Sequence, residues 1–544
     1  MTYGHVKLLL FLLVGASTFW YAMRYQLHML QLNTYINKEQ CAWLKKNFLQ
    51  VWTLPACTFL GALQLIFNNI VIDVVNLLFL LLTLYVFRAY KRIFVKKPLH
   101  FTGRVDRLIA TDCVISLLVI VVAVVIFVIN CAYLPTNDFL NAGRNVICGM
   151  ITILTGLQIV FVMLANIVNI PIEKCVRNYY INDAREILKQ RPDLKIIGVT
   201  GSYGKTSMKF YLQTLLQAKY DVLVTPESYN TPMGIVKTIR ESLLPTHEIF
   251  ICEMGARYVG EIKEICDIVH PDLGIITSIG PAHLETFGSI KNIQKTKFEL
   301  ADALPNNSCI ILNGDSELVV KEEERRNKAG IRTDLKTVFY GTKTCFTNLS
   351  FKADNISASS AGTSFACNGV DFHTKLVGEH NVVNIVGAIA CASTLGVDLN
   401  SLKIPVRRIM PVPHRLELKK HGNITILDDA FNSNPAGSKA AVETLALFDG
   451  TRILITPGMV ELGDRELEYN EQFGRIAATC CDYILLVGKK RAEVIKIGAL
   501  SAGFAENNIS VFPSFNDAYN FAMTIGAKEQ QKIILIENDL PDNY

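Results

Sequence analysis

Charged residues are scarce in this chain of 544 residues: Asp, Glu, Lys and Arg make up only 19%, and the net charge is +5. Neither the basic blocks of a nucleic-acid-binding protein nor an acidic tail is present, so we expect no nucleic acid as a partner. The fourteen cysteines form no CxxC pair and no Cys/His cluster with zinc spacing. Their scattered positions are typical of reduced thiols rather than of a disulfide framework.

Apolar residues, in contrast, make up half of the chain and are concentrated at its N-terminal end. The apolar run 53–87 is too long for one upright helix across a bilayer. It predicts either a tilted long helix or two short helices with a turn near Asn68 and Asn69. A cleaved signal peptide is disfavoured because further apolar runs follow the first one. We therefore predict a transmembrane region over residues 1–170 with four or five helices, from the apolar runs 6–23, 53–87, 108–134 and 146–169.

The distribution of positive charge predicts the orientation of this region. The segment 88–107 carries seven Lys and Arg residues against one Asp, which places it in the cytoplasm. Everything after residue 170 is then cytoplasmic, and the protein is a multi-pass protein of the plasma membrane. The same segment is also suited to contact anionic lipid or polyprenyl phosphate. No apolar run carries a paired charge, which disfavours a transport pathway.

A different pattern begins after the last apolar run. Residues 171–194 are polar and charged, which predicts a cytoplasmic linker helix. Residues 195–410 alternate short β-branched runs with helical stretches, a pattern typical of a parallel sheet covered by helices on both faces. Residues 343–376 interrupt it with a small antiparallel excursion. Residues 411–544 predict a second, smaller α/β domain of Rossmann-like type. The expected fold class is thus an α-helical membrane domain followed by α/β domains.

The stretch GVTGSYGKTS, residues 198–207, follows a predicted strand and precedes a predicted helix. That context suits a phosphate-binding loop, with Gly201 and Gly204 allowing a tight turn of the backbone. Lys205 can reach the β- and γ-phosphates of ATP, and Thr206 or Ser207 can offer a hydroxyl to Mg²⁺. The spacing GxxGxxGKTS differs from the usual GxxxxGK[ST] of nucleotide-binding loops.

This variant loop resembles that of the Mur ligases, and further segments resemble Mur ligase motifs in the same order. Three of them, at 225–235, 251–262 and 275–290, look like segments of the D-alanyl-D-alanine-adding member of the family. The resemblance covers most of residues 195–490, with the segments TPESYNTPMGI, ICEMGARYVGEI, IITSIGPAHLETFGSI, KTKFEL, GEHNVVN, PHRLE, DDAFNSNP and GMVELG. It implies a central P-loop ATPase domain and the Mur ligase C-terminal domain.

The resemblance implies an ADP-forming ligase that activates a carboxylate as an acyl phosphate, which an amine then attacks. Because a carboxylate and a triphosphate repel each other, the reaction needs cations. The family uses ATP and, as we expect here, two Mg²⁺ ions. Four residues correspond to the catalytic set: Lys205, His283, Lys297 and Arg415. The implied metal ligands are Thr206, Glu253, His283 and, if CO₂ carbamylates it, Lys297.

The implied ATP contacts are Gly201, Ser202, Gly204, Lys205, Thr206, Ser207, Asn384, Arg415 and Asp429. The implied substrate contacts are Asn230, Asn432, Asn434 and Glu461. Three of these residues also have ordinary structural interpretations. Asn384 can cap a helix, Lys297 can be an exposed helix lysine, and Glu461 can be a surface residue.

The chain departs from the family pattern in two places. Predicted membrane helices occupy the position in which the soluble family members have the domain that binds the UDP-sugar. The C-terminal lysine-containing KGS-type segment of the family is replaced by LIENDLPDNY. These departures leave the acceptor open: a UDP-linked or lipid-linked muropeptide with D-alanyl-D-alanine or another amine. The alternatives are ligation onto another envelope polymer, such as a poly-γ-glutamate capsule, and a nucleotide-binding regulatory membrane protein.

Overall fold

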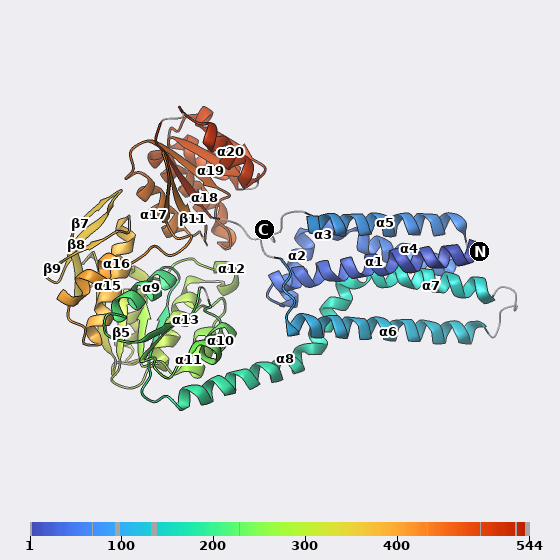
Figure 1. Cartoon of the computed structure of the whole chain (residues 1–544), viewed down its shortest axis with the longest axis horizontal. Coiled ribbons are helices and arrows are strands. Elements are labelled where there is room, and N and C mark those ends of the chain that lie inside the picture. The colour runs from blue at the N-terminus through green and yellow to red at the C-terminus, as the bar shows by residue number, and fades with distance from the viewer. Residues whose placement is uncertain are drawn as a thin grey trace. The chain divides into compact units, whose positions relative to one another are not determined.

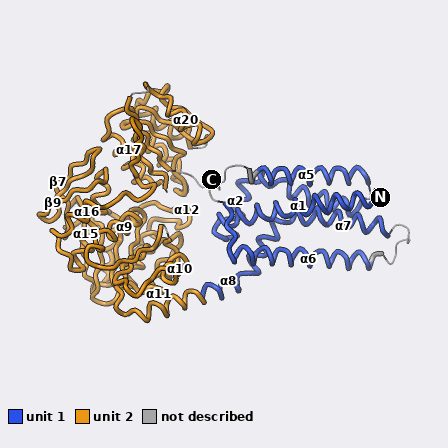
Figure 2. Tube along the Cα trace, viewed as in Figure 1, with its two compact units in different colours: residues 1–178, 540–544 blue, residues 179–539 orange. Residues whose placement is uncertain are grey.

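The structure is a computed structural model that describes residues 3–67, 69–92, 98–131, 139–227, 229–431, 433–489, 491–527 and 530–538. The chain divides near residue 178 into two compact units (Figure 2). The first unit is helical, and the second is α/β.

The first unit is a bundle of mostly long helices (Figure 1). The run 53–87 forms two of them, because α4 ends at Ile66 and α5 begins at Ile70. This is the second of the two arrangements that the sequence leaves open. The helices are α1 (Tyr3–Leu32), α2 (Asn37–Lys46), α3 (Phe48–Val51), α4 (Thr53–Ile66), α5 (Ile70–Arg92), α6 (Gly103–Cys131), α7 (Phe139–Gly156) and α8 (Gln158–Lys189).

Among the residues that the structure describes, four helices are long and apolar enough to cross a membrane: α1, α5, α6 and α8. Helix α4 is a shorter apolar helix of 14 residues. Many large apolar side chains of α6 point outward, among them Leu117, Leu118 and Val121. An outward apolar face on a helix of this length suits contact with lipid.

The interior of this bundle contains a buried ion pair. Lys7 Nζ of α1 lies 2.6 Å from Asp73 Oδ2 of α5, and both side chains are almost fully buried. Asp73 also accepts a hydrogen bond from Gln64 (2.8 Å), and Lys7 donates one to Asn145. The expectation that no apolar run carries a paired charge is therefore wrong. The two partners are far apart in sequence, so only the folded bundle reveals the pair.

Helix α8 continues from the last apolar run into the linker without interruption, although Pro171 lies inside it. Its C-terminal part belongs to the second unit, where Ile181 and Ala184 are buried beneath the main sheet. The predicted linker helix is thus the continuation of the last apolar helix.

The second unit is built around a nine-stranded sheet in the order β2-β3-β1-β4-β5-β6-β7-β8-β9. The strands from β2 to β6 are parallel. Helices α9 and α15 pack on one face, and α10, α11 and α13 on the other (Figure 1). The parallel strands are β1 (Lys195–Thr200), β2 (Val222–Val224), β3 (Ile249–Glu253), β4 (Leu273–Ile276), β5 (Cys309–Asn313) and β6 (Lys336–Gly341); the helices are α9 (Lys205–Leu216), α10 (Pro232–Ser242), α11 (Glu261–Val269), α12 (Leu284–Phe287), α13 (Ile290–Ala303), α14 (Glu317–Lys328), α15 (Glu379–Thr394) and α16 (Lys403–Arg408).

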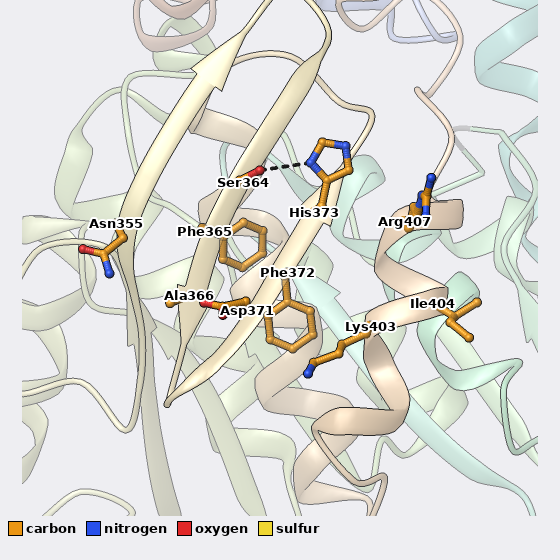
Figure 3. Close-up of a pocket in the computed structure, with 10 residues that line it drawn as sticks. All are labelled: Asn355, Ser364, Phe365, Ala366, Asp371, Phe372, His373, Lys403, Ile404 and Arg407. Atoms are coloured by element: carbon orange, nitrogen blue, oxygen red, sulfur yellow. Dashed lines mark hydrogen bonds between the residues drawn. The ribbon is translucent and has the colours of Figure 1, made fainter.

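The predicted antiparallel excursion consists of β7 (Phe351–Ser359), β8 (Gly362–Cys367) and β9 (Val370–Thr374), which extend one edge of this sheet. A hollow of about 450 Å³ lies between these strands and α16 (Figure 3). Phe372, Lys403 and Arg407 line it, together with the hydrogen-bonded pair Ser364 and His373 (3.0 Å). None of its ten lining residues belongs to the predicted site.

A six-stranded sheet in the order β10-β11-β15-β12-β13-β14 forms the C-terminal domain. It is parallel except for β10, which pairs antiparallel with β11. Two apolar cores cover its faces, one beneath α17–α19 and one beneath α20. The elements are β10 (Glu417–His421), β11 (Ile424–Asp429), α17 (Pro435–Leu445), β12 (Thr451–Thr456), α18 (Glu466–Cys480), β13 (Tyr483–Val487), α19 (Ala492–Ser501), β14 (Ile509–Phe512), α20 (Phe515–Thr524) and β15 (Lys532–Glu537).

We predict that Lys7→Met destabilises the helical unit by about 3–5 kcal/mol, because it leaves Asp73 buried without its cation. The double variant Lys7→Met/Asp73→Asn is expected to lose less, since it removes both charges. The measurement is the labelling rate of buried Cys148 by a thiol reagent, read by mass spectrometry on the full-length protein in detergent. The exposed Lys45→Met is the control, and an unchanged rate in Lys7→Met would contradict the prediction.

Candidate active site

The predicted phosphate loop joins the end of β1 to the start of α9. Gly201 has φ +151° and Gly204 has φ +80°, in the left-handed region that favours glycine. A Cβ atom on Gly201 would lie 2.0 Å from Thr277 Oγ1, and one on Gly204 would lie 2.7 Å from Asn384 Oδ1. Only glycine therefore fits at these two positions, in a loop that leads into the N-terminus of α9, the end of a helix at which phosphate groups bind.

Contacts with the segment after β4 hold this loop in place. Ser202 N donates to Ser278 O (2.6 Å), and Ser202 Oγ donates to Gly280 O (3.0 Å). Lys205 folds back over the loop, and its Nζ donates to the carbonyls of Gly201 (2.8 Å) and Ser202 (3.1 Å). Burial lowers the pKa of Lys205 to about 8, although nearby Glu253 opposes the shift.

A fully buried carboxylate, Glu253, lies at the end of β3 beside the loop. Its Oε1 accepts hydrogen bonds from Thr206 Oγ1 (3.1 Å) and Asn230 Nδ2 (3.0 Å). Its Oε2 lies 3.0 Å from Nζ of Lys209, which is also fully buried. Burial raises the pKa of Glu253, but Lys209 and Lys205 outweigh it, so the pKa is lowered and the carboxylate stays ionised.

These residues fit a nucleotide and a magnesium ion. Mg²⁺ prefers oxygen ligands, and the Thr206 hydroxyl and the Glu253 carboxylate place two oxygens 3.1 Å apart. The glycine cradle of the loop fits a phosphate group at the start of a helix. Ser207, the other hydroxyl that the sequence offers, lies half-buried on α9.

Arg415 brings the C-terminal domain to the same place. Its Nη2 donates to Thr206 Oγ1 (3.3 Å), and its guanidinium lies 4.9 Å from the ring centre of Phe431. Burial lowers the pKa of Arg415 from its usual value, and Glu253 and Asp429 oppose that shift. Three predicted site residues from three segments of the chain thus converge: Thr206, Glu253 and Arg415.

Lys297 on α13 is buried close to this group. Among the residues that the structure describes, none accepts a hydrogen bond from Lys297 Nζ, and no carboxylate lies within ion-pair distance of it. The ring centre of Phe287 lies 5.9 Å from Nζ. Burial first, and the charge of Lys205 second, lower the pKa of Lys297 to about 7. The interpretation of Lys297 as an exposed helix lysine does not match this burial.

Two other predicted residues meet at a second point between the domains. His283 Nδ1 is hydrogen-bonded to a carboxylate oxygen of Glu461 from the C-terminal domain. The other carboxylate oxygen of Glu461 accepts a hydrogen bond from Arg257 Nη2 (3.2 Å). Glu461 therefore bridges two side chains of the central domain and is not a plain surface residue.

The remaining predicted residues lie around these two groups. Asn384 on α15 faces Gly204, and Asp429 ends β11, where its Oδ1 accepts from Leu416 N (3.2 Å). Burial, followed by the charge of Glu537, raises the pKa of Asp429 to about 7. Asn434 caps α17 through Gly437 N (2.9 Å), so its substrate contact stays a prediction. Asn432 lies outside the described residues.

Sequence reasoning missed Lys209 and Arg257. Lys209 lies one turn after Lys205 on α9, and i, i+4 neighbours share a helix face, so this signal was available. Arg257 follows the strand that ends at Glu253, but nothing in the sequence connects it to Glu461. That contact depends on the packing of two domains.

The geometry agrees with comparisons to known proteins. The model of the Mur ligase middle domain matches residues 199–392, and that of the Mur ligase glutamate ligase domain matches residues 414–536. The UDP-N-acetylmuramoyl-tripeptide–D-alanyl-D-alanine ligase of Escherichia coli K12 is 30% identical over 325 residues, which are 59% of this chain and 70% of the relative. The chain belongs to the Mur ligase family.

Other relatives of this Mur ligase support the assignment. The same-named ligase of Bacillus subtilis 168 is 29% identical over 59% of this chain and 68% of the relative. A solved MurF from Acinetobacter baumannii superposes with a TM-score of 0.58 at 25% identity, over 67% of this chain and 78% of that one. The fold also matches a MurF ligase from Thermotoga maritima in complex with ADP (TM-score 0.57, 24% identity, 67% and 80% of the two chains). This Mur ligase is an ATP-dependent enzyme with the fold predicted from its sequence.

We predict that Gly204→Ala weakens binding of a non-hydrolysable ATP analogue about tenfold or more, because the left-handed backbone strains alanine by about 1–2 kcal/mol and the new methyl group meets Asn384. Isothermal titration calorimetry on the full-length protein measures the affinity. Gly330→Ala is the matched control, since Gly330 also has a positive φ (+67°) but nothing within 4 Å of its Cβ position. Equal affinities of Gly204→Ala and the control would exclude this loop as the phosphate site.

Proposed function

We propose that this Mur ligase is a membrane-anchored, ATP-dependent amide ligase of cell-wall synthesis that joins D-alanyl-D-alanine to a muropeptide carboxylate. The observation that carries the proposal is the hydrogen bond from Arg415 of the C-terminal domain to Thr206 of the phosphate loop, beside the ionised Glu253. The names of the curated relatives, which are tripeptide–D-alanyl-D-alanine ligases, support this choice of amine and acceptor.

The proposed reaction has two steps. An acceptor carboxylate oxygen attacks the γ-phosphorus of ATP, the bond to the bridging β–γ oxygen breaks, and ADP leaves. The amine nitrogen then attacks the carbon of the acyl phosphate, the bond to the phosphate oxygen breaks, and inorganic phosphate leaves. The proton of the amine passes to solvent. Both steps gather negative charge around the γ-phosphate, so positive groups there accelerate them.

The side chains of this site supply that positive charge. Lys205 reaches the β- and γ-phosphates by leaving the loop carbonyls that it now contacts, and Arg415 neutralises the γ-phosphate from the other domain. Mg²⁺, two ions in our proposal, supplies further charge when bound at Thr206, Glu253 and His283. Asn230 orients Glu253 through its amide. Asn384 and Asp429 are the proposed contacts of the adenine and the ribose.

Lys297 is the proposed site of a carbamate. CO₂ reacts with a neutral amine, and the pKa of Lys297 is lowered to about 7 by burial. The resulting carbamate is an anion that would replace an unpaired amine in a buried position close to Lys205. Such an anion would be a ligand for the second Mg²⁺ ion.

The contacts within the helical unit support a topology with five crossings. We place the basic segment 88–107, at the end of α5, in the cytoplasm. Asp73 at the start of α5 then lies at the outer end, together with Lys7 of α1, Gln64 at the end of α4 and Asn145 of α7. The crossings are thus α1, α5, α6 and α7 with α8, and the shorter α4 of 14 residues is the fifth, which returns the chain toward the start of α5. The N-terminus is outside and the ligase domains are cytoplasmic.

We predict that the purified full-length protein releases phosphate from ATP only with Mg²⁺, D-alanyl-D-alanine and a muropeptide. UDP-linked tripeptide, lipid-linked tripeptide and poly-γ-glutamate are the three acceptor arms, and mass spectrometry identifies the product. Lys205→Ala is expected to lower turnover at least a hundredfold, because it removes a cation from the transition state. If only poly-γ-glutamate supports phosphate release, the acceptor is that polymer and not a muropeptide. ATP binding without turnover in any arm would favour a regulatory protein.

We predict that carbamylation of Lys297 rises with pH through about 7. The folded protein lowers the pKa of this amine, so its neutral form grows from a minority at pH 6 to roughly nine-tenths at pH 8. Carbon NMR with labelled bicarbonate detects the carbamate. Lys297→Met should remove the signal, whereas the exposed Lys295→Met on the same helix should keep it. A carbamate signal that persists in Lys297→Met would rule out this assignment.

A further inference from the structure

The side chain of Glu461 joins the two ligase domains at His283. Glu461 lies in the segment after β12 and has φ +62°, a left-handed conformation that is uncommon for a residue other than glycine. One of its carboxylate oxygens is bonded to His283 Nδ1, and the other accepts from Arg257. The core of the C-terminal domain holds this segment, since the flanking Met459 and Leu462 are buried in it, whereas the Glu461 side chain reaches the central domain.

The backbone of His283 is fixed independently of that contact. His283 has φ +52° at the start of α12, and its carbonyl accepts from Thr286 N (3.1 Å), Thr286 Oγ1 (3.0 Å) and Phe287 N (3.1 Å). The central domain therefore fixes where the imidazole begins. Only Glu461, from the C-terminal domain, is bonded to its ring among the described contacts.

A carboxylate on one ring nitrogen determines what the other nitrogen can do. Glu461 is an acceptor, so His283 Nδ1 carries the proton, and in the neutral imidazole Nε2 then has the lone pair that a metal ion needs. Histidine metal ligands commonly donate their second N–H to a carboxylate, which fixes the tautomer and the ring orientation. Arg257 supports this arrangement, because its cation balances the charge of Glu461 at 3.2 Å.

We propose that Glu461 is a positioning residue for His283: it sets the imidazole to bind a divalent cation through Nε2, and it does so only when the two domains are closed. This inference rests on the proposed function, in which His283 is a metal ligand. It replaces the expectation that Glu461 contacts the substrate. Closure then completes the metal site at His283 at the same time as it brings Arg415 to Thr206.

The test counts bound Mn²⁺ by electron paramagnetic resonance on the full-length protein in detergent with a non-hydrolysable ATP analogue. Wild type is expected to bind two ions. Glu461→Gln should weaken one of the two about 10–100-fold, because a neutral amide no longer fixes the tautomer, and His283→Ala should lose the same ion. Glu468→Gln is the matched control, since Glu468 is an exposed glutamate of the same domain that pairs with Arg465.

The outcomes separate the two levels of the proposal. If wild type binds no Mn²⁺ with the analogue, the proposed function fails. If His283→Ala loses an ion but Glu461→Gln binds both with wild-type affinity, the positioning role is overturned and the proposed function stands. If Glu461→Gln fails to bind the analogue or unfolds, Glu461→Asp and Arg257→Met decide. If both variants bind the same Mn²⁺ ion more weakly than wild type, the positioning role is supported. If both variants bind the two ions with wild-type affinity, the role is rejected.

Discussion

The site depends on keeping one buried carboxylate charged. Burial of Glu253 raises the free energy of its ionised form, and the fold offsets this with the cation of Lys209 and with hydrogen bonds from Thr206 and Asn230. Thr206 and Lys209 lie on α9, and Asn230 lies just before α10. Buried ion pairs contribute little net stability, but they are satisfied in few arrangements. Glu253 therefore fixes the phosphate-loop helix and Asn230 relative to β3.

The strand order explains why these partners meet. In the main sheet, β1 lies between β3 and β4, so the phosphate loop after β1 is flanked by Glu253 on one side and by residues 277–283 on the other. Ligands of open α/β sheets bind at the carboxyl ends of the strands. This edge carries the glycine cradle, the carboxylate and His283. The Mur ligase chemistry follows from residues that parallel pairing brings to one edge.

The sequence predicted what depends on local order. Local patterns of glycine, β-branched residues and helical periodicity indicate the phosphate loop and the strand before it. They also indicate the strand that ends at Glu253 and the order of the domains. The Lys7–Asp73 pair was missed because its partners lie far apart along the chain. The short strands β10 and β14 were missed as well, although β10 forms a hairpin with the neighbouring β11. Asn434 shows a local signal that was overlooked. Asn followed by Pro at a helix start is a local capping signal, and the structure uses the side chain that way.

Contacts at two separate points make the closed arrangement of the ligase domains specific. Arg415, bonded to Thr206, restrains the C-terminal domain at one point. The second contact, from Glu461 to His283 and Arg257, restrains it at another. Both contacts use charged or imidazole groups whose partners are polar, so opening the domains exposes them to water at little cost. A closure that is specific in geometry but modest in free energy suits an enzyme that must admit ATP and release ADP in every turnover.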